Sequence, residues 1–240
     1  MKIILLFSLI FQFTIAFATI DHKLWNDILS KNVSDEGLVD YQAIHENQNP
    51  LNEYLDMLSK NHPDETWSLN ESKAFWINAY NAYTIKLIID NYPVKSIKDI
   101  GGKIYKINTP WDIKFISIGD EKYDLNNIEH GILRKEFNDP RIHFAINCAS
   151  ISCPVLRNEA YTSEKMDNQL DEQAKRFIND PTKNTITENE IKLSKIFSWF
   201  RGDFTKTNSL VEFINKYALI KIKPTDAIDY LDYNWSLNKK

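Results

Sequence analysis

The stretch SLNESKAFWINAYNAYTIKLIIDN, residues 68–91, decides how this chain folds. Ser68 and Glu71 form the S-x-x-E pattern of a capping box, in which each side chain accepts a hydrogen bond from the other residue's backbone. The apolar run that follows continues to Tyr92-Pro93, where the residue before proline is disfavoured in a helix. The pattern therefore predicts one long helix.

Two asparagines, Asn78 and Asn81, interrupt this helix. Asparagine is a poor helix former, because its side chain competes for backbone hydrogen bonds. At a spacing of three residues the two amides share a face, among Trp76, Tyr80 and Tyr83. A buried amide without partners costs roughly 1–3 kcal/mol. We expect either a structural network that pins neighbouring loops or amides that orient a histidine or bind a polar substrate.

Outward from this helix, the residue pattern predicts an α+β fold. We expect a single domain, residues 19–240, in which the long Asn/Tyr-bearing helix packs on a small, mostly antiparallel sheet. The predicted helices cover residues 20–32, 51–58, 68–91, 124–134, 154–179 and 209–217. The predicted strands are 38–39 and 142–148, with hairpins within 104–123 and 185–195.

Composition excludes several classes of protein. The chain has 240 residues, of which 43% are hydrophobic and 12% aromatic, too many for a disordered protein. Its 33 acidic and 29 basic residues give a net charge of −4, which argues against a general nucleic-acid binder. Two cysteines cannot build a disulfide-dense scaffold or a four-cysteine zinc site.

Residues 1–18, MKIILLFSLIFQFTIAFA, are typical of a secretory signal peptide. Lys2 precedes an apolar stretch that is short for a membrane span, and Ala16 and Ala18 fit the small-x-small cleavage pattern. An uncleaved anchor is the alternative. No later stretch is long and apolar enough to span a bilayer, so we expect the mature domain in the periplasm or secreted.

The segment RIHFAINCASISCPVLR, residues 141–157, holds both cysteines and one of the five histidines. If residues 142–148 form a strand, His143 and Cys148 point to opposite faces, so His143 pairs better with Cys153. If Pro154 opens a helix, Cys153 lies at or beside its N-cap, where the helix dipole lowers the pKa of a thiol. Asn147, just before Cys148, is a further candidate for binding or orienting.

Three states of the two cysteines stay open at this point. Cys148 and Cys153 form a small disulfide, which is typical of exported proteins; or one of them is a catalytic thiol; or both are buried, inert thiols. In a disulfide, neither cysteine could act as a nucleophile.

A third segment, Ile128–Arg134, carries Glu129, His130 and Arg134. Adjacent side chains on a helix diverge by about 100°, so Glu129 and His130 do not act on each other, although either could face the cysteines. No metal-binding motif occurs, and zinc would be the first candidate if a metal were bound. No nucleotide or dinucleotide fingerprint and no G-x-S-x-G elbow is found, and we expect no cofactor.

Four strings together resemble the family described as domain of unknown function 547: FWINAYNAYTI (75–85), LNNIEHGILR (125–134), HFAINCASISCPVLR (143–157) and IDYLDYNWSLN (228–238). The resemblance runs from about residue 50 to 238. Asn234 stands where the family usually has an acidic residue. The resemblance implies a recurrent domain and supplies no activity.

Two functions fit these observations. The first is an exported thiol hydrolase or acyl transferase, in which Cys153 is the nucleophile, His143 the base, and Glu129 or Asn78 the group that orients the imidazole; Cys148 is a further catalytic candidate. The second is a non-catalytic binding or scaffold domain with a Cys148–Cys153 disulfide, in which the Asn/Tyr helix and the aromatic tail line a pocket or partner surface. The partner would be a polar small molecule or a peptide.

Overall fold

A computed structural model describes residues 20–101 and 109–240 of this chain. The predicted signal peptide, residues 1–18, lies outside the described residues, as do Ile104 and Ile107 of the predicted hairpin region.

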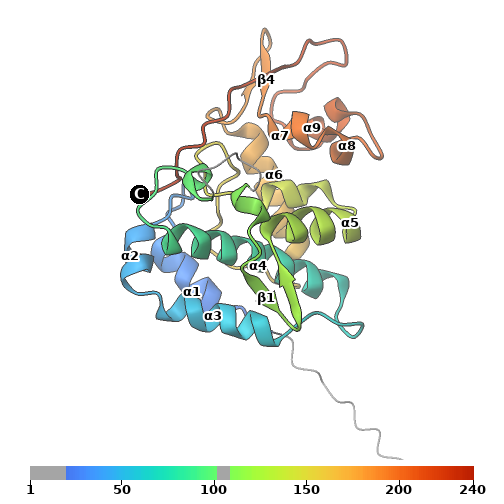
Figure 1. Cartoon of the computed structure of the whole chain (residues 1–240). Helices are drawn as coiled ribbons and strands as arrows, with labels where there is room; N and C mark the ends of the chain where they lie inside the picture. Colours follow the sequence, from blue (N-terminus) through green and yellow to red (C-terminus); the bar gives the residue numbers. More distant parts are fainter. Residues whose placement is uncertain (1–19, 102–108) are drawn as a thin grey trace, which may run out of the picture.

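The long helix, α4, spans Leu69–Asp90 and lies at the centre of the molecule (Figure 1). Its capping box is present as predicted: the Ser68 hydroxyl accepts from the Glu71 N–H, and the Glu71 carboxylate accepts from the Ser68 N–H. Most of its residues are buried, on all sides of the helix. Such a helix is covered by other elements all round rather than facing water with one stripe.

Three helices and one hairpin form a group with α4 (Figure 1). They are α1 (Lys23–Asn32), α2 (Tyr41–Glu46), α3 (Asn49–Lys60) and the antiparallel pair β1 (Ile116–Ile118) and β2 (Glu121–Tyr123). In this group α2 and α3 pack directly on α4, and α1 packs on α2 and α3. The Tyr83 hydroxyl on α4 donates to the Ser117 carbonyl in β1, so the helix and the hairpin are in contact.

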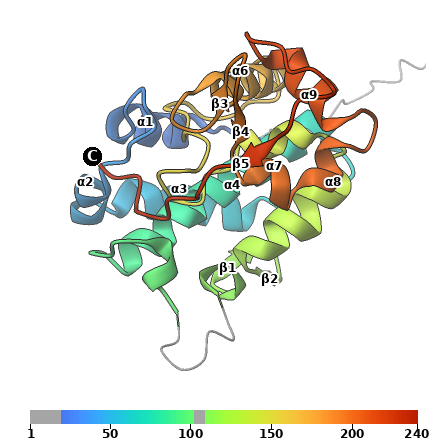
Figure 2. The same ribbon diagram turned by 90° about the horizontal axis from the view of Figure 1, so that it is seen from above.

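The C-terminal elements form a second group around Phe144 (Figures 1 and 2). They are α6 (Met166–Asn179), β3 (Thr185–Ile186), β4 (Ile191–Leu193), α7 (Ile196–Trp199), α8 (Arg201–Phe204), α9 (Leu210–Tyr217) and β5 (Asp229–Tyr230). β4 pairs antiparallel with β3 and parallel with β5. The α+β class and the small, mostly antiparallel sheets are confirmed, and helices dominate.

Short helical segments lie between these elements along the chain. They are η1 (Ile97–Asp99), η2 (Pro110–Asp112), the π-helical η3 (Asn127–Leu133), α5 (Arg134–Glu136) and the 3-10 segment η4 (Pro140–Phe144). The helix predicted for residues 124–134 is thus present, with π geometry over most of its length.

Two predictions for the cysteine segment are wrong. Residues 142–148 do not form a strand, because Asp139 caps the 3-10 turn that Pro140 opens and the chain then continues without pairing. The helix predicted to start at Pro154 starts at Met166 instead. Residues 154–165 are non-helical because side-chain amides bind their backbone, as Asn147 does at the Pro154 carbonyl.

The last residues of the chain return from the C-terminal group to the N-terminal one (Figures 1 and 2). Backbone hydrogen bonds join Ser236 to Ile151, Leu237 to Lys95 and Asn238 to Val39. The tail, residues 233–240, therefore ties together segments that are distant in the sequence.

Candidate functional site

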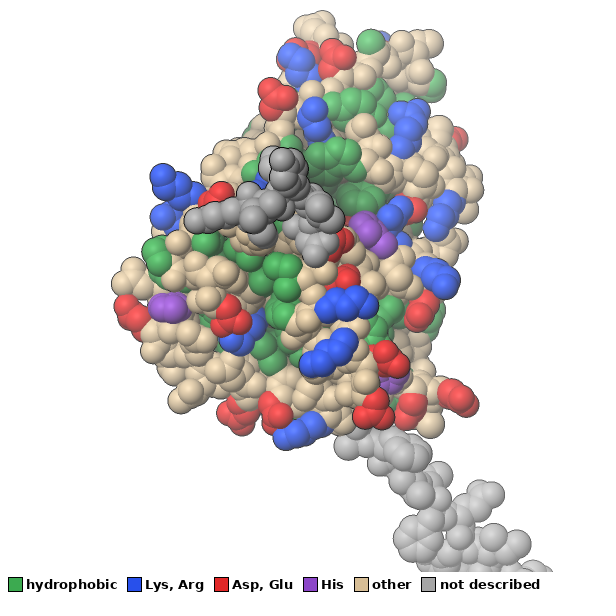
Figure 3. Space-filling view, viewed as in Figure 1, with side chains coloured by type: hydrophobic (Ala, Val, Ile, Leu, Met, Phe, Trp, Pro, Cys, Tyr) green, Lys and Arg blue, Asp and Glu red, His purple; other side chains and the backbone are tan. Residues whose placement is uncertain are grey.

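A cavity of about 180 Å³ lies where the predicted motifs meet. It is lined by Tyr80, Trp111, Asn126, Glu129, His130, His143, Ile146, Cys148, Cys153, Pro154, Ile196, Trp199, Phe200, Tyr233 and Trp235. On the face seen in Figure 3, hydrophobic side chains reach the surface in the upper half, with a histidine at the lower end of this patch. The lining is mainly aromatic, with few polar side chains.

Glu129 is the acidic residue of the cavity lining. The π-helical segment η3 packs on α4 and turns this side chain inward, so that it is 8% exposed. The Tyr80 hydroxyl on α4 donates to its Oε2 at 3.3 Å. Burial raises the pKa of Glu129 to about 7, since a carboxylate loses hydration in apolar surroundings. The group therefore changes charge near neutral pH.

His143 is held by Asp203, a residue of α8, with its Nε2 at 2.8 Å from Oδ2 of the carboxylate. The Arg134 Nε donates to the same oxygen at 2.6 Å. The hydrogen bond from His143, with the help of Arg134, lowers the pKa of Asp203, whereas burial lowers the pKa of His143. The arrangement is a neutral imidazole that donates its Nε2–H to a carboxylate.

The other ring nitrogen of His143, Nδ1, is buried and has no hydrogen-bond partner among the described residues. The imidazole also stacks on Phe200, with ring centroids 4.0 Å apart. With Nε2–H engaged by Asp203, Nδ1 carries the lone pair. The His143 ring is therefore buried and held in one orientation by Asp203 and Phe200.

His130 lies next to Glu129 in sequence but is exposed, as the divergence of adjacent helical side chains predicts. Its Nδ1 is 3.0 Å from an Arg134 guanidinium nitrogen. Burial of part of the ring and the neighbouring Arg134 charge lower the pKa of His130. The imidazole is therefore neutral at pH 7 and lies at the outer part of the site.

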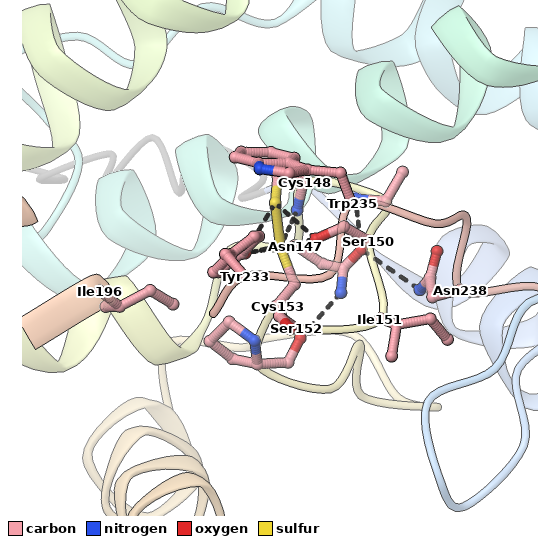
Figure 4. The surroundings of a disulfide bond; sticks show 12 residues. Asn147, Cys148, Ser150, Ile151, Ser152, Cys153, Ile196, Tyr233, Trp235 and Asn238 are labelled. Carbon is pink, nitrogen blue, oxygen red and sulfur yellow. Dashed lines mark hydrogen bonds between the residues drawn. A yellow bond between two sulfur atoms is a disulfide. The ribbon is translucent and has the colours of Figure 1, made fainter. Parts of the chain in front are cut away.

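Cys148 and Cys153 form a disulfide bond in the cavity wall, with an S–S distance of 2.14 Å (Figure 4). Tyr233 and Trp235 lie beside the two sulfurs. The Cys148 N–H donates to Cys153 Sγ at 2.9 Å, and the Tyr233 hydroxyl donates to the same sulfur at 3.2 Å. Of the three states considered for these cysteines, the structure has the disulfide, and no helix N-terminus lies at Cys153.

Four residues make what we call the aromatic wall: Trp111, Trp199, Tyr233 and Trp235. Their ring centroids lie close together, 4.5 Å for Tyr233–Trp235, 4.8 Å for Trp199–Tyr233 and 5.6 Å for Trp111–Trp235. Trp199 is 48% exposed, an unusual position for so large an apolar side chain. The wall therefore presents aromatic surface to whatever enters the cavity.

Asn78 and Asn81 do not line the cavity. Asn78 binds both the N–H and the carbonyl of Tyr161, at 3.0 and 2.8 Å. Asn81 binds the Ala145 carbonyl at 3.0 Å and the Asn147 N–H at 2.8 Å. Both amides are fully used in pinning the backbone of neighbouring loops.

Asn147 is likewise buried behind the disulfide. Its side chain accepts from the Ala149 N–H at 2.8 Å and donates to the Pro154 carbonyl at 2.7 Å. Ala149 has a φ of +57°, a conformation that a non-glycine residue adopts at a cost, and this hydrogen bond helps to hold it. Asn147 thus shapes the Cys148–Cys153 loop.

The structure brings five predicted site residues to one cavity: Cys148, Cys153, His143, Glu129 and His130. Arg134 lies beside it, bound to His130 and Asp203. Sequence reasoning missed Asp203, which it had replaced by Glu129 or Asn78 as the group that orients His143. No local motif marks Asp203, because 60 residues separate it from His143.

Within residues 20–101 and 109–240, no group of three or more His, Cys, Asp or Glu side chains is arranged to hold a metal ion. The same part of the chain contains no helix with both the length and the apolar composition that a membrane crossing needs.

Comparison with known proteins confirms the family resemblance. Residues 65–178 match the model of the family described as "Protein of unknown function, DUF547". This range contains α4, Glu129, His143 and both cysteines. No curated protein and no solved structure matches the chain.

Proposed function

We propose that this domain binds a small molecule through an alkylated ammonium group, which enters the cavity and contacts Glu129 and the aromatic wall. The observation that carries the proposal is a carboxyl group buried at an aromatic-lined cavity. The proposal develops the second function considered from the sequence, a non-catalytic binding domain. The Cys148–Cys153 disulfide lines one side of its cavity.

Glu129 explains why the ligand would be a cation. None of the ion pairs between described residues includes Glu129, and its hydrogen-bond partner Tyr80 is neutral. The nearby Arg134 charge lowers the pKa of Glu129 less than burial raises it, and Arg134 is itself paired with Asp203. A buried carboxylate without a cation is costly, which is why its pKa rises toward neutrality. A cationic ligand would supply the missing charge and favour the ionised form.

The aromatic wall explains why the cation would carry alkyl groups. Aromatic faces attract cations, and this attraction is strongest for desolvated groups such as quaternary ammonium. Two rings of the cavity lining already contact cationic side chains. The Lys98 ammonium lies 3.9 Å from the ring centroid of Trp235, and the Arg134 guanidinium lies 5.0 Å from the ring centroid of Phe200. Methyl groups on the ligand would also bury apolar area against these rings.

A sugar, which would also stack on aromatic rings, fits less well. Its many hydroxyl groups each need a partner when they lose water. The polar side chains of the lining are few, and His143 and Asn126 already bind Asp203 and Asp112. A ligand with one polar, charged head and an apolar body suits this lining better.

The test compares choline with 3,3-dimethylbutan-1-ol, its neutral isostere, by tryptophan fluorescence and calorimetry. We expect choline to bind and the neutral isostere to bind at least roughly tenfold more weakly. Glu129→Gln should weaken choline binding by a similar factor, whereas Glu121→Gln, an exposed residue of β2 outside the cavity lining, should leave it unchanged.

The pH dependence gives an independent readout. Since the cation favours ionised Glu129, choline affinity should rise as pH increases through about 7, with proton release on binding below that pH. Equal affinity for the two isosteres, or an unchanged affinity in Glu129→Gln, would reject the proposal.

We further propose that the domain works outside the cytoplasm, in the periplasm or secreted. The signal-like residues 1–18 and the disulfide bond support this, because structural disulfides persist in oxidising compartments. The exported protein should begin at Thr19 by mass spectrometry. A full-length N-terminus in the exported fraction would reject cleavage at Ala18.

A thiol hydrolase is not our proposal. A disulfide-bonded Cys153 is no nucleophile, and the extended chain after Pro154 offers no helix dipole to activate a thiol.

A further inference from the structure

The Cys148–Cys153 disulfide forms part of the cavity lining, where a small molecule can reach it. We propose that this bond undergoes thiol–disulfide exchange with a small thiol that enters the cavity. Cys148 is the sulfur attacked and Cys153 is the leaving group. This activity goes beyond cation binding and does not depend on it.

The two cysteines differ in exposure. Cys153 is 3% exposed, whereas Cys148 is partly exposed. An attacking thiolate needs access to the sulfur with which it forms a bond. Exposure therefore favours Cys148 as the sulfur that the small thiolate attacks.

A backbone hydrogen bond also favours Cys153 as the leaving group. Cys153 Sγ accepts from the Cys148 N–H at 2.9 Å, a contact that Cys148 Sγ does not make. The Tyr233 hydroxyl lies 3.2 Å from Cys153 Sγ and 3.3 Å from Cys148 Sγ, and the Ser150 hydroxyl lies 3.4 Å from Cys148 Sγ. Hydrogen bonds to a developing thiolate stabilise it, and a stabilised thiolate leaves faster. The Cys148 N–H is in place on Cys153 Sγ before the bond breaks, and the Tyr233 hydroxyl is within reach of the same sulfur.

Tyr233 is suited to this role. Burial raises the pKa of Tyr233, so its hydroxyl keeps its proton at any pH at which thiols react. The Ser150 hydroxyl lies 3.3 Å away and donates to the Tyr233 oxygen, which leaves the phenolic proton free to point at sulfur. Ser150, Tyr233 and Cys153 thus form a donor chain.

The exchange balances in two steps. The thiolate of the small thiol attacks Cys148 Sγ, the Cys148–Cys153 bond breaks, and its electron pair stays on Cys153 as a thiolate. A second small thiolate attacks the outer sulfur of the mixed disulfide and expels the Cys148 thiolate. Two small thiols are then joined as a disulfide, and the protein has gained two electrons.

The experiment uses the oxidised, folded protein and 2-mercaptoethanol without oxygen, with acid quenching, alkylation by N-ethylmaleimide and peptide mass mapping. We expect the mixed disulfide on Cys148 and the maleimide label on Cys153. Cys153→Ser should trap a stable adduct at Cys148 when offered the oxidised form of the same thiol. Cys148→Ser should react far more slowly, through the buried Cys153.

Tyr233→Phe keeps the ring and removes the donor, so opening of the disulfide should slow roughly tenfold, whereas Tyr230→Phe should open at the wild-type rate. Near-ultraviolet circular dichroism checks that each variant is folded. Adducts on Cys153, equal rates in Tyr233→Phe and wild type, or opening only in denaturant would overturn the proposal. Opening only in denaturant would mean that the disulfide is a structural cross-link.

Discussion

At the scale of single residues, Glu129 combines burial with the capacity to ionise near neutral pH. Its folded-state pKa of about 7 lies above the unfolded value of about 4.3, so the folded protein binds more protons between these values. Stability is therefore lost as pH rises through this window. A buried ionisable residue at a cavity lowers stability, and such residues are typical of functional sites.

Glu129→Gln should therefore stabilise the protein above about pH 7, because the amide has the same shape and cannot ionise. The gain in the free energy of unfolding should reach roughly 3 kcal/mol and shrink toward zero as pH falls to about 4.3. Urea titrations of both proteins across this range measure it, with Glu121→Gln as the exposed control. Parallel stability curves for Glu129→Gln and wild type would show that burial does not perturb this carboxyl.

At the scale of elements, α4 is packed on all sides in the core, and its two buried amides bind neighbouring loops to it. Asn81 spans the Ala145 carbonyl and the Asn147 N–H, so the helix fixes the loop that leads into the disulfide. The local position of the cysteines is thus set by a side chain more than 60 residues earlier.

Asn81→Ala should leave a buried carbonyl and a buried N–H without partners and lower the free energy of unfolding by about 3 kcal/mol. Asn70→Ala, in the first turn of the same helix and without a side-chain hydrogen bond to described residues, should change it by less than about 0.5 kcal/mol. Equal changes from the two variants in urea unfolding would argue that the hydrogen bonds of the Asn81 amide add no stability of their own.

The elements that the sequence predicted well are those with local signals. The helix predicted from the Ser68–Glu71 capping box begins there, and the helix predicted for residues 209–217 begins at a second capping box, Ser209 with Glu212. Residues 154–165 were predicted wrongly because their conformation depends on distant amides, such as Gln173 at the Val155 carbonyl. The 3-10 turn had a signal that we did not use, Asp139 followed by Pro140.

At the scale of the whole molecule, the cavity is assembled from all parts of the chain. Glu129, His143 and the cysteines could be predicted because they cluster in short motifs, and the aromatic tail was expected to line a pocket. Asp203 and Phe200 could not, because packing of the C-terminal group brings α7 and α8 to His143. No local pattern encodes that packing.

The C-terminal tail also positions the aromatic wall, because Asn238 anchors this tail to the N-terminal segment. Asn238 is 4% exposed; its amide donates to the Gly37 carbonyl and its oxygen accepts from the Tyr41 hydroxyl. Its backbone binds Val39 and Ala149, so this one residue joins the N-terminal segment to the disulfide loop. Tyr233 and Trp235 lie only a few residues earlier and depend on this anchor.

Asn238→Ala should therefore lower the free energy of unfolding by about 3 kcal/mol and also weaken choline binding, although Asn238 does not line the cavity. Asn234→Ala should change both quantities little, because this asparagine is exposed and its side chain has, among the residues that the structure describes, only the nearby Ser236 N–H as a partner. Urea unfolding and calorimetry at a temperature where both variants are folded separate the two effects. If Asn238→Ala is destabilised but binds choline as tightly as wild type, packing among its own rings positions the aromatic wall. The hydrogen bonds of Asn238 would then contribute to stability and not to binding.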